Sequence, residues 1–287
     1  IQFDYYKYGS AVPSMSQRDL NQIRLPYPPL EEQKIIADFL DEQSAKITRF
    51  IQTKQRFIEL LKEQRQSIIT NAVTKGIDDG VKMKETGIKW MPEVPEHWEI
   101  RRLKYLVELY KHNKTQTHSN GFDFKIALEN IDNWTGKYVE SVSPDFEGEG
   151  RYFQEGDVLF GKLRPYLAKA FLPEIKGVCV SEILVFTPNS ELITSEFLFQ
   201  RILTKGFIDI VDGSTYGAKM PRASWDFIGN MRIAFPPTIE EQNQIVEHIK
   251  TETRTLDIAI SKAEREIELI KEYREAMIAE AVTGKKL

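Results

Sequence analysis

Cysteine is almost missing from this sequence, because Cys179 is the only one among 287 residues. A single cysteine cannot form a disulfide within the chain, and it makes a cysteine-based zinc site implausible. A reducing, cytoplasmic compartment is therefore expected. Cys179 lies between Val178 and Val180 and is predicted to be a buried strand residue rather than a nucleophile.

Long hydrophobic runs and an excess of one charge are missing as well. No window approaches the ~18 apolar residues of a membrane span, and Ile1-Gln2-Phe3-Asp4 does not resemble a secretory signal. The chain carries 39 Lys+Arg against 43 Asp+Glu, a net charge of −4. Taken alone, this balance argues against a nucleic-acid binder. Its 41% hydrophobic and 29% charged residues fit a globular protein of one large or two modest domains.

Signatures of catalysis are also absent. The sequence contains no P-loop, no Gly-rich dinucleotide motif and no Asn/Asp-Pro-Pro-Tyr/Phe motif of amino-methyltransferases. Its four histidines, at 97, 112, 118 and 248, have no metal-ligand spacing. Pro144-Asp145 and Glu174-Ile175-Lys176 imitate a metal-nuclease pattern, which we interpret as a chance match. These observations predict a chain that is not an enzyme and has no metal site.

What the chain does contain is an internal repeat of about 70 residues at each end. Arg24-Leu25-Pro26-Tyr27-Pro28-Pro29 recurs as Arg232-Ile233-Ala234-Phe235-Pro236-Pro237. Glu31-Glu32-Gln33 recurs as Glu240-Glu241-Gln242, and the alignment continues without a gap to Thr74 and Thr283. Neither Pro nor Gly interrupts 31–75 or 238–283. Each stretch is predicted to form one helix of about 45 residues, roughly 67 Å long.

An apolar seam follows both predicted helices with identical spacing of 4, 7, 3, 7 and 4 residues. Its members are Ile47, Ile51, Ile58, Leu61, Ile68 and Ala72 in the first copy and Leu256, Ile260, Ile267, Ile270, Met277 and Ala281 in the second. A long helix with one narrow apolar stripe must bury it against another long helix. We expect the two copies to pair as a coiled coil; pairing of each helix with another chain stays the alternative.

Between the helices the pattern changes to short β-branched or aromatic runs bounded by Gly, Pro or Ser. Examples are 156–160, 178–180 and 183–186. Residues 197–204 are predicted to form a short helix, with Ser195 as a candidate cap. Trp90 and Trp98 are expected to pack at the start of this domain rather than to stack on bases. The fold class predicted is α+β, with one mixed α/β domain flanked by two long helices.

This combination resembles the DNA-specificity subunit of type I restriction-modification systems. The resemblance is carried by both Pro-Pro-x(1–2)-Glu-Glu-Gln helix starts, by Trp90-Met91-Pro92-Glu93-Val94-Pro95-Glu96-His97-Trp98 and by the 153–166 segment, and it covers essentially the whole chain. It implies that the helices pack antiparallel as a spacer between domains that each read half of a bipartite DNA site. The domains it implies are a C-terminal remnant of a first target-recognition domain over 1–30, a spacer helix over 31–75, a target-recognition domain over 76–239 and a second spacer helix over 240–287.

The resemblance also implies partners and the location of the chemistry. The chain would be a non-catalytic subunit that binds double-stranded DNA, docks methyltransferase subunits and is joined through them by a restriction translocase. S-adenosylmethionine, ATP and Mg²⁺ would belong to those partners, so no cofactor is expected in this chain. A subunit with one recognition domain is expected to be a fragment, a natural truncation or a half that forms a homodimer.

The distribution of charge removes the objection to DNA binding. Segment 101–222 carries 16 basic and 16 acidic residues, whereas 240–287 carries 8 and 11, and 76–100 carries 3 and 6. Phosphate contact requires a local cationic face rather than a cationic chain. The candidate DNA-binding residues lie in three loops: Lys111, Asn113 and Lys114; Lys162, Arg164, Tyr166 and Lys169; and Ser214, Thr215, Lys219 and Arg222. For each alone, a solvated surface side chain is the alternative. The contrasting function is a coiled-coil scaffold whose α/β domain binds another protein.

Overall fold

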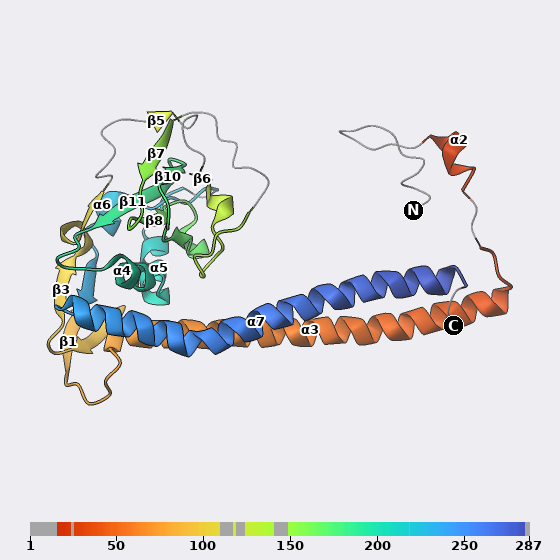
Figure 1. Cartoon of the computed structure of the whole chain (residues 1–287), viewed down its shortest axis with the longest axis horizontal. Helices are drawn as coiled ribbons and strands as arrows, with labels where there is room; N and C mark the ends of the chain where they lie inside the picture. Colours follow the sequence, from red (N-terminus) through yellow and green to blue (C-terminus); the bar gives the residue numbers. More distant parts are fainter. Residues whose placement is uncertain are drawn as a thin grey trace. The chain divides into compact units, whose positions relative to one another are not determined.

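The computed structural model describes residues 16–23, 26–109, 117–118, 124–140, 149–217 and 219–284 (Figure 1). The chain forms two compact units. The helix-pair unit combines Ile1–Leu61 with Ala259–Leu287, and the sheet unit is Lys62–Ile258. The two long helices contribute residues to both units, which are described here one at a time.

The long helices are α3, Leu30–Lys75, and α7, Ile239–Val282. Each begins just after a Pro-Pro pair, and each places two glutamates in its first turn, where the helix dipole favours negative charge. α3 ends at Gly76, which adopts the left-handed conformation (φ 79°) that favours glycine at this position. The shorter helices are α2, Gln17–Leu20; α4, Ser195–Ile202; α5, Lys205–Gly213; and α6, Trp225–Ile228. Within the described residues, no helix is both long and apolar enough to cross a membrane.

In the helix-pair unit, α3 and α7 share a small apolar cluster. Ile58 of α3 is only 8% exposed and clusters with Ile260, Ala263 and Ile267 of α7, while Ile51 and Leu61 pack against this cluster. The ammonium of Lys54 lies 2.5 Å from the carboxylate of Glu266. In the sheet unit, Arg65 pairs with Asp257 at 2.9 Å. Partner numbers fall along α7 as they rise along α3, so the helices are antiparallel.

The described residues of the sheet unit form four small sheets, in which the β10–β6 pair is parallel and the other strand pairs are antiparallel. Their orders are β1-β2, β5-β7-β10-β6, β4-β11-β8-β9 and β12-β3. The strands are β1, Met83–Ile88; β2, Met91–Pro95; β3, Glu99–Arg102; β4, Val107–Leu109; β5, Thr117–His118; β6, Lys125–Ile126; β7, Glu149–Phe153; β8, Val158–Gly161; β9, Ala170–Phe171; β10, Gly177–Cys179; β11, Ile183–Pro188; and β12, Arg232–Phe235.

The main core of the sheet unit fills the space between the β4-β11-β8-β9 sheet, helices α4 and α5, and the inner ends of the long helices. Phe160, Phe197 and Phe207 are fully buried there, together with Val73 of α3 and Ile245 of α7. A second cluster of buried residues includes Phe153 and Cys179 of the β5-β7-β10-β6 sheet and Leu159 and Val185 of the β4-β11-β8-β9 sheet. The long helices are therefore part of the core of this unit, not appendages to it.

The predicted α+β class is confirmed, and Cys179 and Trp98 are buried as predicted. Two local predictions were wrong. The short helix starts at Ser195 rather than 197, because Thr194 is the cap and its hydroxyl accepts the N–H of Phe197 at 3.2 Å. A further helix, α5, was not predicted, because Gly206 and Gly213 weaken the helical signal.

Candidate nucleic-acid interface

Three segments of the sheet unit, two of which carry predicted DNA-contacting cations, are held together by backbone hydrogen bonds. The segment after β8 is joined to residues 221–223 by two backbone hydrogen bonds, Arg164 N to Pro221 O at 2.8 Å and Ala223 N to Lys162 O at 2.9 Å. Lys162 N also donates to the carbonyl of Glu182, in the turn between β10 and β11, at 2.9 Å. These bonds bring together residues that are 20 to 60 positions apart in the sequence. We call Lys162, Arg164, Tyr166, Glu182, Tyr216, Lys219 and Arg222 the basic platform.

The backbone of the platform is held in an uncommon conformation. Arg164 and Ala168 both adopt left-handed dihedral angles, with φ of 51° and 47°, on either side of a single 3-10 turn, Pro165–Leu167. Non-glycine residues rarely occupy this region, and when they do it is often at a functional site. Trp134 N donates to the Ala168 carbonyl at 3.2 Å and helps to hold the turn. Arg164 and Tyr166 consequently remain exposed, Tyr166 by 48%.

Another part of the platform is formed by Tyr216 and Arg222, whose backbones are paired. Tyr216 and Arg222 exchange two backbone hydrogen bonds, at 3.1 and 3.2 Å. The turn leaves Lys219 exposed and the ring of Tyr216 exposed by 64%. Two tyrosines and two cations thus lie exposed on joined loops. Aromatic faces with Arg and Lys are a combination suited to phosphate, sugar and base edges.

One carboxylate sits among the platform cations. Arg222 donates from Nε to both carboxylate oxygens of Glu182 at 3.2 Å and from Nη2 to Oε1 at 3.1 Å. Hydrogen bonding to Glu182 raises the pKa of Arg222. Burial lowers the pKa of Lys162, whose ammonium lies 4.0 Å from Glu182. The platform therefore presents four cations against one carboxylate, within a chain of net charge −4.

Three other predicted contact residues are engaged by the protein's own backbone. The ammonium of Lys169 donates to the carbonyl of Leu128 at 2.5 Å, and burial lowers its pKa. The hydroxyl of Ser214 donates to Val211 O, and that of Thr215 donates to Asp212 O. These bonds stabilise the loops that carry the platform. Lys111, Asn113 and Lys114 lie outside the described residues, as does Pro144-Asp145.

The predicted seam residues all lie on the inner, buried or half-buried side of the long helices. Ile47, Ile58, Ala72, Ile260, Ile267, Met277 and Ala281 are buried, and Ile51, Leu61, Ile68, Leu256 and Ile270 are half-buried. Ile58, Ile260 and Ile267 share one cluster. The predicted seam residue Ala72 lies in the core of the sheet unit together with Ile69 and Val73, two further buried residues of α3 that the spacing did not include.

Within the sheet unit, the second Glu-Glu-Gln motif joins the first turns of α7 to the neighbouring strands and loops by side-chain hydrogen bonds. The indole N–H of Trp98 donates to Glu241 Oε1 at 2.8 Å, and His97 Nε2 lies 2.9 Å from the same carboxylate. Gln242 is fully buried and accepts the N–H of Thr194 at 2.8 Å. Its amide donates to the carbonyls of Leu192 and Pro236 at 2.8 and 3.0 Å. The motif therefore fixes the domain to its helix.

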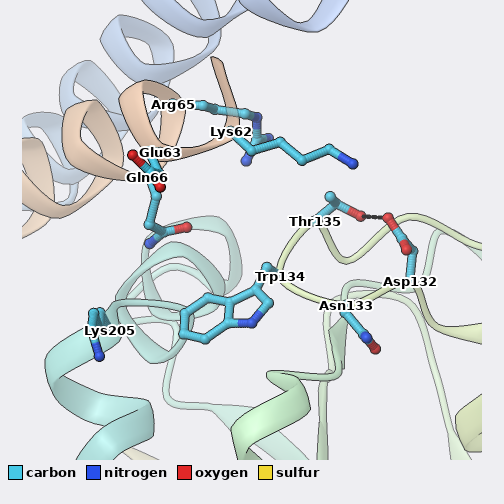
Figure 2. A pocket seen from close by; sticks show the side chains of 9 residues that line it. All are labelled: Lys62, Glu63, Arg65, Gln66, Asp132, Asn133, Trp134, Thr135 and Lys205. Atoms are coloured by element: carbon cyan, nitrogen blue, oxygen red, sulfur yellow. Dashed lines mark hydrogen bonds between the residues drawn. The ribbon is translucent and has the colours of Figure 1, made fainter. Parts of the chain in front are cut away.

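An open cavity of about 520 Å³ lies beside α3, between Lys62–Gln66, the 132–135 turn and Lys205 (Figure 2). Trp134 lines it in a left-handed conformation (φ 63°), and Thr135 donates to Asp132 at 2.6 Å. Gln66 donates to Leu203 O. Across the described part of the chain, no three His, Cys, Asp or Glu side chains gather in a way that could hold a metal ion.

Glu182 and Tyr216 are the platform members missing from the residues singled out in the sequence. Glu182 lies between two apolar runs, 20 residues from Lys162 and 40 from Arg222, so no local spacing connects it to either. The only sequence signal is a carboxylate at a turn between two buried strands. Tyr216 directly follows Ser214 and Thr215, which the sequence did single out.

Comparison with known proteins gives one consistent family. The family model described as "Type I restriction modification DNA specificity domain" matches residues 2–60 and 95–269. The chain is 21% identical over 294 residues to the type I restriction enzyme EcoDI specificity subunit of Escherichia coli. It is 27% identical over 291 residues to the MjaVIII specificity subunit of Methanocaldococcus jannaschii. Each match covers 96% of this chain and 65% of the relative, so the chain spans just under two thirds of those proteins.

A solved structure shares the fold. It was determined in work on complex assembly and conformational transition of the type I R-M system. Its similarity to this chain has a TM-score of 0.64 at 15% identity, and it covers 99% of this chain and 68% of the other. At this identity the likeness concerns the fold alone.

Proposed function

This chain belongs to the type I restriction-modification DNA specificity family, and from that premise we propose that it recognises DNA sequence without catalysing a reaction. The sheet unit would read one half of a bipartite site through the basic platform. The observation that carries the proposal is the platform itself. Its exposed Arg164, Tyr166, Tyr216 and Lys219 stand on loops joined by backbone hydrogen bonds, in a chain that is otherwise acidic.

Within the platform we assign different tasks to different side chains. An arginine can donate two hydrogen bonds to the O6 and N7 of guanine, so Arg164 is the candidate base reader. Lys219 is a flexible point charge and suits a phosphate. Tyr166 and Tyr216 can pack on sugars or donate hydroxyls to phosphates. Lys169, Ser214 and Thr215 would support the loops, because their polar groups are already bonded to backbone carbonyls.

The long helices would serve as spacer and as docking surface. We propose that methyltransferase subunits bind along them and that the restriction translocase joins through those subunits. The methyl donor, ATP and Mg²⁺ would then be bound by the partners. Support for the spacer role comes from the antiparallel pairing of α3 and α7 through the Ile58 cluster and the Lys54–Glu266 pair.

The repeat suggests where a second recognition domain would attach. At the start of α3, Gln33 donates to Pro28 O at 2.7 Å, as Gln242 donates to Pro236 O at the start of α7. Glu32, the counterpart of Glu241, is exposed. We infer that Glu32 and Gln33 would hold another recognition domain, supplied by a longer form of the protein or by a second copy in a homodimer.

Salt dependence tests the DNA proposal against a protein-binding scaffold. With methyltransferase subunits present, affinity for a random-sequence duplex should fall steeply with salt, by about 0.9 log units per log unit of salt for each phosphate contact. Lys219→Ala should reduce the slope by about 0.9. Lys205→Ala, which removes an exposed lysine of α5 that is paired with Asp209, is the control and should leave the slope unchanged. A flat salt response or no binding would contradict the proposal.

A further inference from the structure

Glu182 occupies a place in the platform that DNA attraction alone does not explain. Its carboxylate accepts three hydrogen bonds from Arg222 and lies 4.0 Å from Lys162. A carboxylate here subtracts from the positive potential that draws in phosphates, since a bound duplex is itself an array of negative charge. If the platform served only general DNA affinity, this position would be better filled by a neutral or basic side chain.

The Glu182–Arg222 pair also differs from an ordinary surface ion pair. Both side chains are partly enclosed, at 26% and 35% exposure. The backbone on each side is fixed, because Glu182 O accepts Lys162 N while Arg222 exchanges two hydrogen bonds with Tyr216. Exposed ion pairs contribute little because two flexible side chains must be ordered to form them. Here backbone hydrogen bonds already hold the main chain of both Glu182 and Arg222 in place.

The geometry of the pair determines which edge of the guanidinium remains available. Glu182 takes the side edge of Arg222, made of Nε and Nη2. A guanidinium is planar and carries five N–H groups, so the edge formed by Nη1 and the second hydrogen of Nη2 stays free for another acceptor pair. Two parallel donors held in one plane match the O6 and N7 atoms of guanine.

We propose that Glu182 is a specificity-determining positioning residue, which fixes the plane of Arg222 so that its remaining donor edge reads a base. This inference rests on the proposed function. In exchange for some non-specific attraction, Glu182 holds Arg222 to a single orientation and prevents it from turning to the nearest phosphate. Discrimination between sequences would then depend on an acidic residue that need not touch DNA.

The proposal makes opposite predictions for two binding constants. Glu182→Gln removes the negative charge at nearly constant shape and releases Arg222. Affinity for a random duplex should rise and its salt slope should steepen by up to about 0.9, because one more cation can reach a phosphate. The ratio of specific to random affinity should fall by roughly 5- to 150-fold, the range for one lost bidentate base contact.

Two further variants separate position from charge. Glu182→Asp retains the charge but ends one methylene short of Arg222, so discrimination should fall without a gain in random-duplex affinity. Glu191→Gln, at an exposed site of the same unit, changes the net charge by the same amount and should leave discrimination unchanged. In an Arg222→Lys background, Glu182→Gln should reduce discrimination no further, because the side chain through which it acts has lost its fork.

The experiment uses the full chain with methyltransferase subunits and the duplex that the wild-type complex enriches from a random pool. Thermal melting of each variant checks folding, and Glu182→Asp serves if Glu182→Gln does not fold. Discrimination in both Glu182 variants equal to wild type would overturn the inference while leaving DNA recognition intact. The inference would also be overturned if Glu182→Gln reduced discrimination as much in the Arg222→Lys background as it does in the wild-type background. Failure of the wild type to enrich any duplex would instead count against the proposed function.

Discussion

Replacement of Gln242 by leucine would test how the recognition domain is held on α7. The wild-type side chain is fully buried and makes three hydrogen bonds, with Thr194 N, Leu192 O and Pro236 O. Leucine has a similar size but no polar atoms, so three backbone groups, on the half-buried Leu192 and Thr194 and the buried Pro236, would lose these partners. Each unpaired buried group costs about 1–3 kcal/mol. We therefore expect Gln242→Leu to lower the free energy of unfolding by at least about 3 kcal/mol.

Urea unfolding followed by tryptophan fluorescence measures this directly, because Trp90, Trp98, Trp134 and Trp225 all lie in the sheet unit. Gln244→Leu is the matched control. Gln244 is on the same helix but exposed, and its amide donates to the exposed Glu240 side chain at 3.3 Å, so its replacement should cost less than about 0.5 kcal/mol. Losses in the two variants within 1 kcal/mol of each other would refute the reasoning that the buried amide fixes domain to helix.

Three further predictions concern burial. Ile58→Asp should reduce far-UV helix signal and melting temperature, because it places a charge in the helix seam, whereas Ile258→Asp, at a site 61% exposed, should change neither. Burial raises the pKa of the Cys179 thiol to about 12, so native protein at pH 8 should not react with a thiol reagent. The raised pKa favours the neutral thiol in the folded state. The free energy of unfolding should therefore fall as the pH rises from 9.0, the ordinary pKa of a cysteine thiol, towards 12. An equal fall in Cys179→Val would contradict this. Burial also lowers the pKa of Arg201 to about 9, and the Arg201 guanidinium is buried over the Trp90 ring with no carboxylate hydrogen-bonded to it in the described structure. Arg201→Met should leave the free energy of unfolding unchanged or raise it by about 1 kcal/mol, and a loss above 2 kcal/mol would show that stacking outweighs desolvation.

The long helices could be predicted from the sequence because their determinants are local and occur twice. Pro28-Pro29 and Pro236-Pro237 mark the starts, and helix α3 starts at Leu30 and ends at Lys75, one residue longer than the stretch read from the sequence. The 3.6-residue periodicity of apolar residues needs no knowledge of the rest of the fold. The break in the pattern after Gly76 likewise separates helix from sheet, which is why the fold class was accessible.

The candidate DNA-binding site could be predicted from the sequence only in part, because the contacts that form it join residues far apart in the chain. Loop cations such as Arg164 and Lys219 stand out as residue types. Glu182, however, reaches Arg222 only because β11 pairs with β8 and Leu163, just after β8, forms a bridge with Arg222. Similarly, the sequence alone cannot show that the ammonium of Lys169 donates to the carbonyl of Leu128, because the two residues are far apart in the sequence. Helix α5 was missed because Gly206 weakens the helix. In the structure, a side chain at Gly206 would meet the backbone oxygen of Trp90 at 3.1 Å, so packing explains the glycine.

Under the proposed function, this chain decides which DNA sequence its partners modify. Mapping of methylated bases across the genome, in cells with the gene, without it, and with the gene carrying Arg164→Ala, tests this most directly. One split motif should lose its methylation when the gene is removed. In the variant, methylation of that motif should be weakened or relaxed at one base. An unchanged set of methylated sites after removal of the gene would contradict the role of this chain in DNA recognition.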